Sequence, residues 1–497
     1  MKLQQADRRI DSKQARIVLL CAALGMVLLF PWKQPLPAAA VSVFVFGFVQ
    51  ILFPHCRPVA DRPLCPWNWA LLLFGFKLVM LPAAEVVGGV EIGELPHLPS
   101  MRSINAALLL ESLAYICFAA TYNELQARHR ADAIARTLRW YVPGWLMVGY
   151  FIVGMAGVWL FFGSLDVLVA YFRNPAEYML GQINEAPARA GPIAVSTFLR
   201  PFLGFSLVLL VCRLLDRPYG ILKFVWGLSA AALIVLTAVS FSIFSYNRAA
   251  FVAPVLALCA AALSRLRTQT WKITGAGVGV LGLLLAMTTI FRSTHGQTDF
   301  ASSGGEWRTA ASELELSSLV QIYGNGPQFL GFLLEETDGS ELQWGQGLVA
   351  GILSPVPILG KGFRSSSGTA LYNELFNRGD SEDQVISFAG ELFLNFHVPG
   401  VVFGFALLGA LLSCLQNTFL RATSALPVYV IQLTAIWLLF LAVGSVSVVS
   451  QIAIYFYGPI YLYLCLPQRR RRCSALIAQS KRYFPDGVLA PDQPSLN

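Results

Sequence analysis

Charged residues are scarce in this sequence of 497 amino acids. Asp, Glu, Lys and Arg together make up 13% of the chain, whereas hydrophobic residues make up 56% and the mean hydropathy is +0.60. Soluble domains carry about 25% charged residues, so this chain has too few polar side chains to coat a water-soluble globule. The composition excludes a soluble enzyme, a disordered protein and a fibrous repeat. It predicts an all-α fold, a polytopic bundle of membrane helices.

Motifs that bind nucleotides or metals are also absent. The chain has no Walker-type glycine loop, no dinucleotide fingerprint and no Asp-x-Asp metal motif. The nine cysteines and five histidines show no zinc-ligand spacing. These absences exclude an ATP-driven pump on one chain, and we expect no cofactor and no metal. Cationic loops that orient helices in a lipid bilayer explain the net charge of +8, so we expect no nucleic-acid partner.

Long hydrophobic runs, by contrast, are abundant, and they indicate about 12 transmembrane helices. A span needs about 20 apolar residues. The candidate windows are 17–31, 36–53, 69–90, 104–121, 142–163, 193–215, 221–244, 249–264, 273–291, 397–416, 427–446 and 449–466. Most of the 36 lysines and arginines lie in the N-terminal segment, in alternate short loops and in the C-terminal tail. The positive-inside rule therefore places both termini in the cytoplasm.

The end of the first window leaves one alternative open. Ala38-Ala39-Ala40 follows that window and is similar to a signal-peptidase site, so a retained anchor and a cleaved segment both fit the sequence. Either outcome leaves the later loops on the same sides of the membrane.

One long segment interrupts the series of short loops. It divides the chain into membrane helices over 1–291, an outer segment over 292–395, membrane helices over 396–466 and a cytoplasmic tail over 467–497. The outer segment contains amphipathic stretches over 311–335, a proline- and glycine-broken apolar stretch over 345–363, and helical patterns over 370–376 and 383–396. We expect these to form a lid of short helices over the outer mouth of the bundle. A second outer loop, 164–192, has a helical pattern over 165–181.

Ionisable residues within a predicted span are costly in lipid, and Arg200, Glu111 and Lys77 are candidates for a functional role. Arg200 and Glu111 are at similar depths below the outer surface, so they either form a structural ion pair between two helices or line an aqueous pocket that binds substrate. Lys77 lies nearer the cytoplasmic half, and we expect its side chain to snorkel toward that surface.

Cationic residues recur at the outer face of the predicted bundle. Arginine binds phosphate oxygens bidentately and keeps its charge, so such a group suits a phosphate or pyrophosphate head group at the lipid surface. The candidates for this pyrophosphate site are Arg248, Arg200, Arg292, Lys361 and Arg364. Arg248 belongs to the predicted outer turn Tyr246-Asn247-Arg248, whose other two residues are candidates for substrate binding.

The C-terminal third resembles a known family of membrane glycosyltransferases. The stretches that carry the resemblance are Ser354-Pro355-Val356-Pro357 with Lys361, then Asn373, then the segment from Ser387 through Glu391 and Asn395 to Phe396, and Pro399-Gly400. They resemble the oligosaccharide-repeat-unit (O-antigen, Wzy-type) polymerases, with His397 departing from the pattern.

The resemblance implies a GT-C-like glycosyltransferase at the periplasmic face of a bacterial inner membrane. Its substrate would be an oligosaccharide linked to undecaprenyl pyrophosphate, and the growing glycan would pass to a new lipid-linked repeat. In this interpretation Glu391 is the first candidate for the base and His397 the second, while Asn373 and Asn395 bind substrate. The alternative for each histidine is a capping or packing role. Association with a chain-length regulator protein stays open.

Two other functions remain open at this point. An O-antigen ligase shares the architecture and the donor but transfers the glycan to lipid A-core. A flippase or transporter is the alternative from a different class, and it predicts inverted repeats with helices interrupted at matched positions.

Overall fold

Helices make up the part of the chain that the computed structural model describes. The described residues are 37–59, 64–88, 95–129, 137–173, 175–216, 229, 233, 249–265, 324–337, 342–356, 359–375 and 385–466. Among them there is no β-strand, and Leu138 and Ala422 form an isolated bridge. The all-α prediction is confirmed for this part of the chain. Helices satisfy their backbone hydrogen bonds within one segment, which suits a chain this apolar.

The helices vary widely in length. In chain order the α-helices are α2 (Pro37–Leu52), α3 (Pro66–Gly75), α4 (Leu81–Gly88), α5 (Met101–His129), α6 (Gly144–Phe162), α7 (Leu165–Arg173), α8 (Pro175–Asp216), α10 (Ala249–Arg265), α14 (Pro327–Glu336), α15 (Gln346–Leu353), α16 (Gly368–Leu375), α17 (Phe388–Arg421), α18 (Ala425–Phe440), α19 (Val446–Tyr455) and α20 (Gly458–Cys465). The short turns η1 (Pro54–Cys56), η4 (Leu359–Gly362) and η5 (Arg364–Ser366) are 3-10 helices, and η2 (Phe76–Met80) is a π-helix.

Five of the described helical segments are long and apolar enough to cross a membrane. They are Pro66–Val86, Met101–Arg128, Gly144–Phe162, Ala194–Asp216 and Phe388–Arg421. Helices α19 and α20 pass the same test together, although they are bent by 55° relative to each other. The remaining apolar helices α2, α10 and α18 are shorter. The predicted windows 17–31, 221–244 and 273–291 lie outside the described residues, apart from Ser229 and Leu233.

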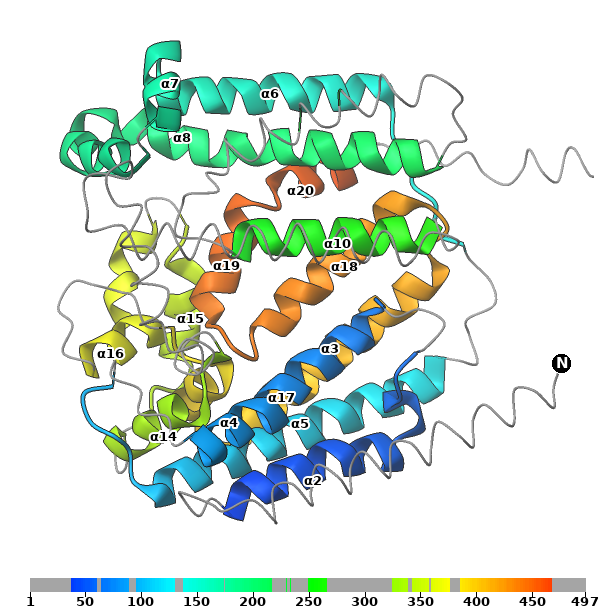
Figure 1. The fold of residues 1–497 in the computed structure, drawn as a ribbon, viewed down its shortest axis with the longest axis vertical. Helices are drawn as coiled ribbons and strands as arrows, with labels where there is room; N and C mark the ends of the chain where they lie inside the picture. The colour runs from blue at the N-terminus through cyan, green and yellow to red at the C-terminus, as the bar shows by residue number, and fades with distance from the viewer. Residues whose placement is uncertain are drawn as a thin grey trace, which may run out of the picture.

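The helices form a layered bundle (Figure 1). Helices α6 and α8 lie along one side and α2 and α5 along the other, with α3, α10, α17 and α18 between them. Helix α5 packs against α17 and α2, and α10 packs against α18. Helices α14, α15 and α16 gather at one end. Helices α14 and α16 correspond to the helical patterns predicted within 311–335 and over 370–376, and their role as a lid stays a prediction.

Two kinds of packing hold the bundle together. In the core, Trp67 stacks on Tyr122 with a ring separation of 4.2 Å and also contacts Phe118. Between α6 and α8, Gly154 and Gly157 lie directly against the neighbouring backbone, so that a Cβ atom at either position would clash. Small residues at such crossings let membrane helices approach closely without a hydrophobic driving force.

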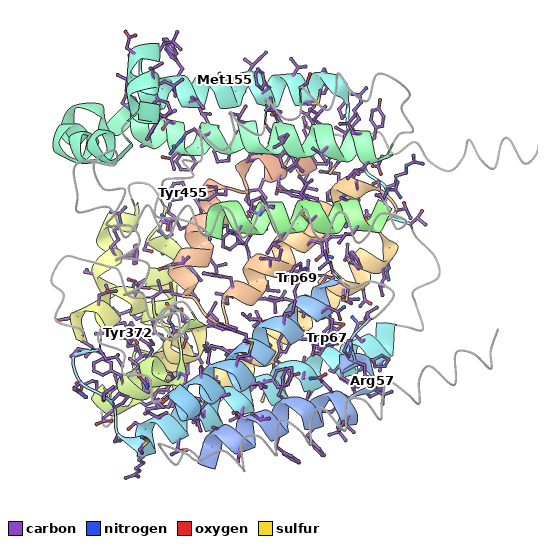
Figure 2. All side chains as sticks on the ribbon, viewed as in Figure 1. Arg57, Trp67, Trp69, Met155, Tyr372 and Tyr455 are labelled. Atoms are coloured by element: carbon purple, nitrogen blue, oxygen red, sulfur yellow. The ribbon has the colours of Figure 1, made fainter. Side chains whose placement is uncertain are left out.

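The two ends of the bundle differ in their polar residues. One end, which we call the arginine end, carries Arg57, Arg128, Arg139, Arg213, Arg265 and Arg421. Backbone and side-chain contacts join its segments, as in the 2.6 Å ion pair between Arg265 and Asp216. The other end, which we call the Glu391 end, contains α14, α15, α16 and the start of α17. Figure 2 shows Arg57 and Tyr372 at these opposite ends.

The structure extends two predicted helical segments. The helical pattern over 165–181 is confirmed, and helical structure continues through the rest of the 164–192 loop, because α7 is followed by α8, which starts at Pro175 and runs into the span. The helical pattern over 383–396 is confirmed from Phe388 onward, and it joins the window predicted from 397 in the single helix α17, which breaks at His397, where φ is 54° and ψ is −151°. Pro399, which has no N–H to donate, follows this break.

Candidate functional site

A fully buried carboxyl group lies in the first turn of α17. Glu391 is 1% exposed, and its Oε2 accepts a 2.7 Å hydrogen bond from the backbone N–H of Val446. Its Oε1 has no hydrogen-bond partner among the described residues. A buried polar atom without a partner is rare in proteins, and it often marks a functional position. Glu391, predicted from sequence as a candidate base, is therefore the centre of the candidate site.

Three helices begin around this carboxyl group. Helix α17 is capped by Ser387, whose Oγ accepts from the N–H of Gly390, and α19 is capped by Ser445, whose Oγ accepts from the N–H of Val448. Helix α16 begins at Gly368, where an added Cβ would lie 3.2 Å from the Oε1 atom of Glu391. A larger residue at this position would press on the Glu391 side chain. Because backbone N–H groups point out of helix starts, they offer donors to a negative group.

Hydroxyl groups lie beside the two backbone positions that contact Glu391. Thr369 Oγ1 and Ser447 Oγ are 3.2 Å apart, and Ser447 Oγ is 3.2 Å from Ser445 Oγ. These residues flank Gly368 and Val446 in sequence. Three hydroxyls therefore flank the backbone positions that contact the carboxyl group, and hydroxyls of this kind suit a ligand rich in hydroxyl groups. The sequence analysis did not identify these three hydroxyls, because α16 and the start of α19 are far apart in the chain and no sequence motif links them.

The two predicted asparagines are buried, and each donates a hydrogen bond to a backbone carbonyl. Asn395, one helical turn further along, is fully buried; its Nδ2 donates to the Glu391 carbonyl and its Oδ1 accepts from the N–H of Gly347. Asn373 is 2% exposed, and its Nδ2 donates to the carbonyl of Thr369. The Asn395 contacts hold α15 beside α17, whereas the Asn373 bond lies within α16. They favour a supporting role for Asn395 over direct substrate binding.

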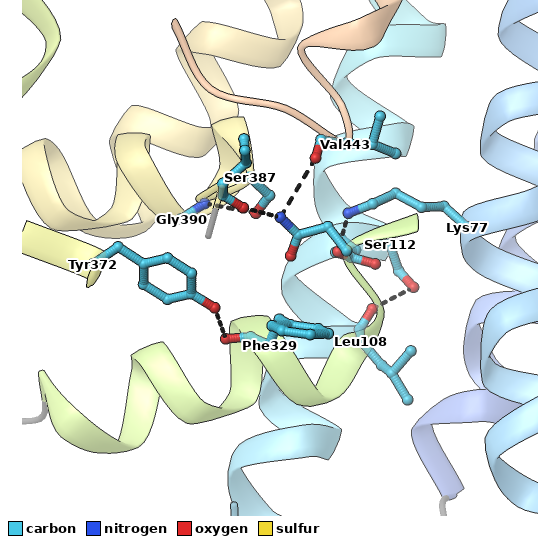
Figure 3. Close-up of polar contacts among 11 residues, drawn as sticks. Lys77, Leu108, Ser112, Phe329, Tyr372, Ser387, Gly390 and Val443 are labelled. Atoms are coloured by element: carbon cyan, nitrogen blue, oxygen red, sulfur yellow. Dashed lines mark hydrogen bonds and ion pairs between the residues drawn. The ribbon is translucent and has the colours of Figure 1, made fainter. Parts of the chain in front are cut away.

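Helix α14 is joined to the site through side chains. The Tyr372 hydroxyl donates a 3.1 Å hydrogen bond to the carbonyl of Phe329, and burial raises the pKa of this tyrosine. Asn325, just before α14, donates to the carbonyls of Val385 and Val443. Figure 3 shows Tyr372, Ser387 and Val443 in one polar region, with Lys77 beside it.

The buried charge on α5 has a different partner from the one predicted. Glu111 forms an ion pair with Lys77, and both residues are less than 5% exposed. The proposed pairing of Glu111 with Arg200 and the snorkelling of Lys77 are therefore wrong. Lys77 lies in the π-helix η2, which widens the turn and carries the amine into the interior between α3 and α5. The sequence gives the depth of Glu111, Lys77 and Arg200 in their spans, but it does not show which side chains face each other. The partner of Glu111 could therefore not be predicted from depth alone.

The predicted cationic group stays a prediction, because only two of its five side chains, Arg200 and Arg364, are described. Arg200 lies over the ring of Phe161, with its guanidinium carbon 4.2 Å from the ring centroid. Arg364 is exposed on η5. The backbone of Lys361 is in η4, but its side chain lies outside the described part of the structure. Arg248 and Arg292 lie outside the described residues, as do Tyr246 and Asn247.

His397, the second candidate base, lies on the surface at the helix break. It is exposed, and its ring packs edge-on against Phe393 at a centroid separation of 4.8 Å. Its left-handed φ explains the break in α17. The geometry therefore favours Glu391 over His397 as the central acid–base group.

An exposed polar contact ties α14 to the start of α5. His97 Nε2 lies 2.8 Å from Glu336 Oε1, and Glu335 Oε2 accepts a 2.7 Å hydrogen bond from the N–H of Ser100. The hydrogen bond to Glu336 raises the pKa of His97, and the hydrogen bond from Ser100 lowers the pKa of Glu335. Within the described ranges, no group of three or more His, Cys, Asp or Glu residues is placed to hold a metal.

Comparison with known proteins gives no relative: no protein-family model, no curated protein and no solved structure matches this chain. What the site can do follows from its chemistry. It combines a buried carboxyl group that has one open acceptor, three hydroxyls and three helix starts. This set is suited to accepting a proton from a hydroxyl group of a bound molecule.

Proposed function

We propose that this protein is a polymerase of lipid-linked oligosaccharide repeat units, acting at the periplasmic face of a bacterial inner membrane. The observation that supports it is Glu391, a buried carboxyl group whose Oε1 has no partner among the described residues. This oxygen has no donor among the described residues, and in the proposed function an acceptor-sugar hydroxyl reaches it in the substrate-bound protein and donates a hydrogen bond to it. The resemblance of the surrounding residues to repeat-unit polymerases supplies the reaction.

The proposed reaction transfers a glycan between two carriers. A hydroxyl oxygen of the acceptor sugar attacks the anomeric carbon of the donor glycan, and a glycosidic bond forms. The bond from that carbon to the pyrophosphate oxygen breaks, and undecaprenyl pyrophosphate leaves with the electron pair. Glu391 takes the proton of the attacking hydroxyl. Proton transfer of this kind contributes about 10²–10⁴-fold to a rate.

The leaving pyrophosphate needs positive charge. Arginine serves because its planar fork matches phosphate oxygens and stays charged. Arg248, Arg292, Lys361 and Arg364 are the proposed donors, and Arg200 is the candidate within a span. We expect Arg248→Ala or Lys361→Ala to abolish long glycan chains while single repeats persist on the cell surface; an unchanged ladder of chain lengths would remove that residue from the site.

The proposed topology has about 12 spans, both termini in the cytoplasm and the 292–395 segment outside. The arginines gathered at one end of the bundle support it, since cytoplasmic boundaries are rich in arginine. The Glu391 end then faces the periplasm, where lipid-linked repeats are polymerised.

Chain growth by the purified protein tests the proposal. Wild-type protein in proteoliposomes receives an undecaprenyl-pyrophosphate-linked repeat unit, with lipid A-core added to a second sample. We expect carrier-linked glycans of increasing length and released undecaprenyl pyrophosphate in both samples. Transfer only to lipid A-core would identify a ligase instead. No transfer in either sample would overturn the glycosyltransferase assignment.

A transporter of lipid-linked oligosaccharide is the second candidate. Two interruptions favour it: the 55° bend between α19 and α20, and the break of α17 at His397. Broken helices surround the substrate sites of many transporters. Movement of a fluorescent lipid-linked oligosaccharide across proteoliposome membranes, without chain growth, would support this function over the polymerase.

A further inference from the structure

Asn325 lies at a junction of three chain segments near the candidate site. It occupies the Gly324-Asn325-Gly326 turn before α14, it is 5% exposed, and its φ is 50°. Its Nδ2 donates a 2.7 Å hydrogen bond to the carbonyl of Val385 and a longer, 3.4 Å one to the carbonyl of Val443. Asparagine tolerates a left-handed backbone better than most residues. Asn325 can therefore adopt the positive φ of the turn and also donate the two side-chain hydrogen bonds.

Both carbonyls belong to segments that lead directly into Glu391 contacts. Val385 comes two residues before Ser387, the cap of α17, which carries Glu391 in its first turn. Val443 comes two residues before Ser445, the cap of α19, whose first N–H is the donor to Glu391 Oε2. The Asn325 amide therefore links the segment that carries the carboxyl group to the segment that binds it.

The turn that carries Asn325 is itself held by a membrane helix. A Cβ atom added at Gly324 would lie 2.7 Å from side-chain atoms of Leu81 and Phe76, so the turn packs closely on η2 and the start of α4. The π-helix η2 presents Phe76 at this contact. Asn325 is thus anchored to the span that begins at Pro66, and a shift of the α17 or α19 start would break a hydrogen bond to it.

We infer that Asn325 is a positioning residue for the proposed glycosyl transfer, acting through Glu391. Its amide fixes the start of α17 relative to the start of α19, and so fixes the direction of Glu391 Oε1. The inference rests on the proposed function. A misplacement of about 1 Å in a reacting group is enough to lower a rate about 10²-fold.

The variants Asn325→Asp and Asn325→Gly test this role. Asp keeps the side-chain shape but has no donor, while Gly keeps the positive φ and has no side chain. Asn68→Asp is the control: near the arginine end, Asn68 Nδ2 donates to the Val59 carbonyl and Asn68 Oδ1 accepts from the Val59 N–H, so Asp removes a comparable amide donor there. Each variant is assayed in proteoliposomes for kcat and for KM toward the lipid-linked repeat. Folding is followed by the melting temperature of the purified protein.

We expect both Asn325 variants to lower kcat about 10- to 100-fold with KM unchanged within about twofold, because the carboxyl group moves while the binding groups stay. We expect Asn68→Asp to lower the melting temperature without changing kcat. If Asn325→Asp fails to fold, Asn325→Gly decides. Unchanged kcat in a folded Asn325 variant, or a parallel loss in Asn68→Asp, would overturn the inference.

A second readout separates this inference from the proposed function. Dicyclohexylcarbodiimide modifies buried carboxyl groups, and peptide mapping measures its rate at Glu391. We expect this rate to change severalfold in the Asn325 variants and to stay unchanged in Asn68→Asp, even if the wild-type protein polymerises nothing. An unchanged rate in the Asn325 variants would contradict the positioning role, whereas a changed rate without any polymerisation would contradict only the proposed function.

Discussion

The arginine end and the Glu391 end of the bundle use carboxyl groups in opposite ways. At the arginine end, Asp216 pairs with Arg265 at 2.6 Å and also accepts the N–H of Ala425 at 3.0 Å. That carboxylate joins the ends of α8 and α10 to the start of α18. At the Glu391 end, the carboxyl group has one backbone donor and one oxygen without a partner among the described residues.

This difference indicates that Asp216 has a structural role and that Glu391 is the candidate functional residue. A satisfied carboxylate near the surface adds stability, whereas a buried oxygen that lacks a donor costs about 1–3 kcal/mol. Proteins tolerate such a loss at functional sites, where local rules of stability are broken. We therefore expect substitutions at the two ends to separate activity from stability.

The largest effect is expected from Glu391→Gln. The amide keeps the shape of the side chain but cannot accept a proton from an attacking hydroxyl, so we expect chain growth to fall about 10²–10⁴-fold. Because the carboxyl group is desolvated, we expect the folded protein to be as stable as the wild type or more stable. Chain length on gels and the melting temperature measure the two quantities. Full activity of Glu391→Gln would break the comparison.

A second substitution tests whether every buried charge of this bundle is functional. Lys77→Met leaves Glu111 buried without its ion pair, and we expect it to destabilise the fold by about 3–5 kcal/mol. The double variant Lys77→Met/Glu111→Leu removes both charges, and we expect it to regain most of that stability. Denaturation in detergent measures both. If the double variant is stable but does not polymerise, the pair has a functional role in addition to its structural one.

Asp216→Ala sharpens the comparison from the arginine end. It removes the acceptor for both Arg265 and the Ala425 N–H, and we expect a loss of about 2 kcal/mol in stability. We expect the rate of chain growth per folded molecule to stay unchanged, because the group lies far from Glu391. The melting temperature and the proteoliposome assay measure the two effects; a lower rate in the folded fraction would contradict the separation.

The smallest effect is expected at the exposed tether between His97 and Glu336. Glu336 raises the pKa of His97, so protonated His97 stabilises the fold below the ordinary histidine pKa of about 6.5, and this contribution disappears as the pH rises through the raised pKa. We expect His97→Gln to melt below the wild type in acid, with a difference that vanishes in alkaline buffer. A difference that grows with pH would show that another group is responsible.

Much of the helical framework was predictable from the sequence, because the hydropathy of a single segment is enough to indicate a buried or membrane-spanning helix. The window 142–163 corresponds to α6, and the pattern at 370–376 corresponds to α16. Within the predicted amphipathic stretches over 311–335, the residues Gly324-Asn325-Gly326-Pro327 are typical of a break between two helices, and α14 starts at Pro327.

The contacts at the site were less predictable, since they join segments far apart in the chain. Glu391 could be chosen from sequence because acids near the spans are few. Its donor Val446, the ion pair of Glu111 with Lys77 and the role of Asn325 depend on which helix faces meet. A π-helix such as η2 rotates the residues after it, and no hydropathy period indicates that rotation.

The sidedness of the Glu391 end is the claim on which the whole account depends, and cysteine labelling tests it most directly. Single cysteines are introduced at the exposed positions Ser365, near α16, and Arg128, at the end of α5, after the nine native cysteines are replaced by serine. A membrane-impermeant maleimide is then added to intact spheroplasts. The account predicts that Ser365→Cys is labelled at once and Arg128→Cys only after lysis. The reverse pattern would place Glu391 at the cytoplasmic side and contradict the proposed reaction.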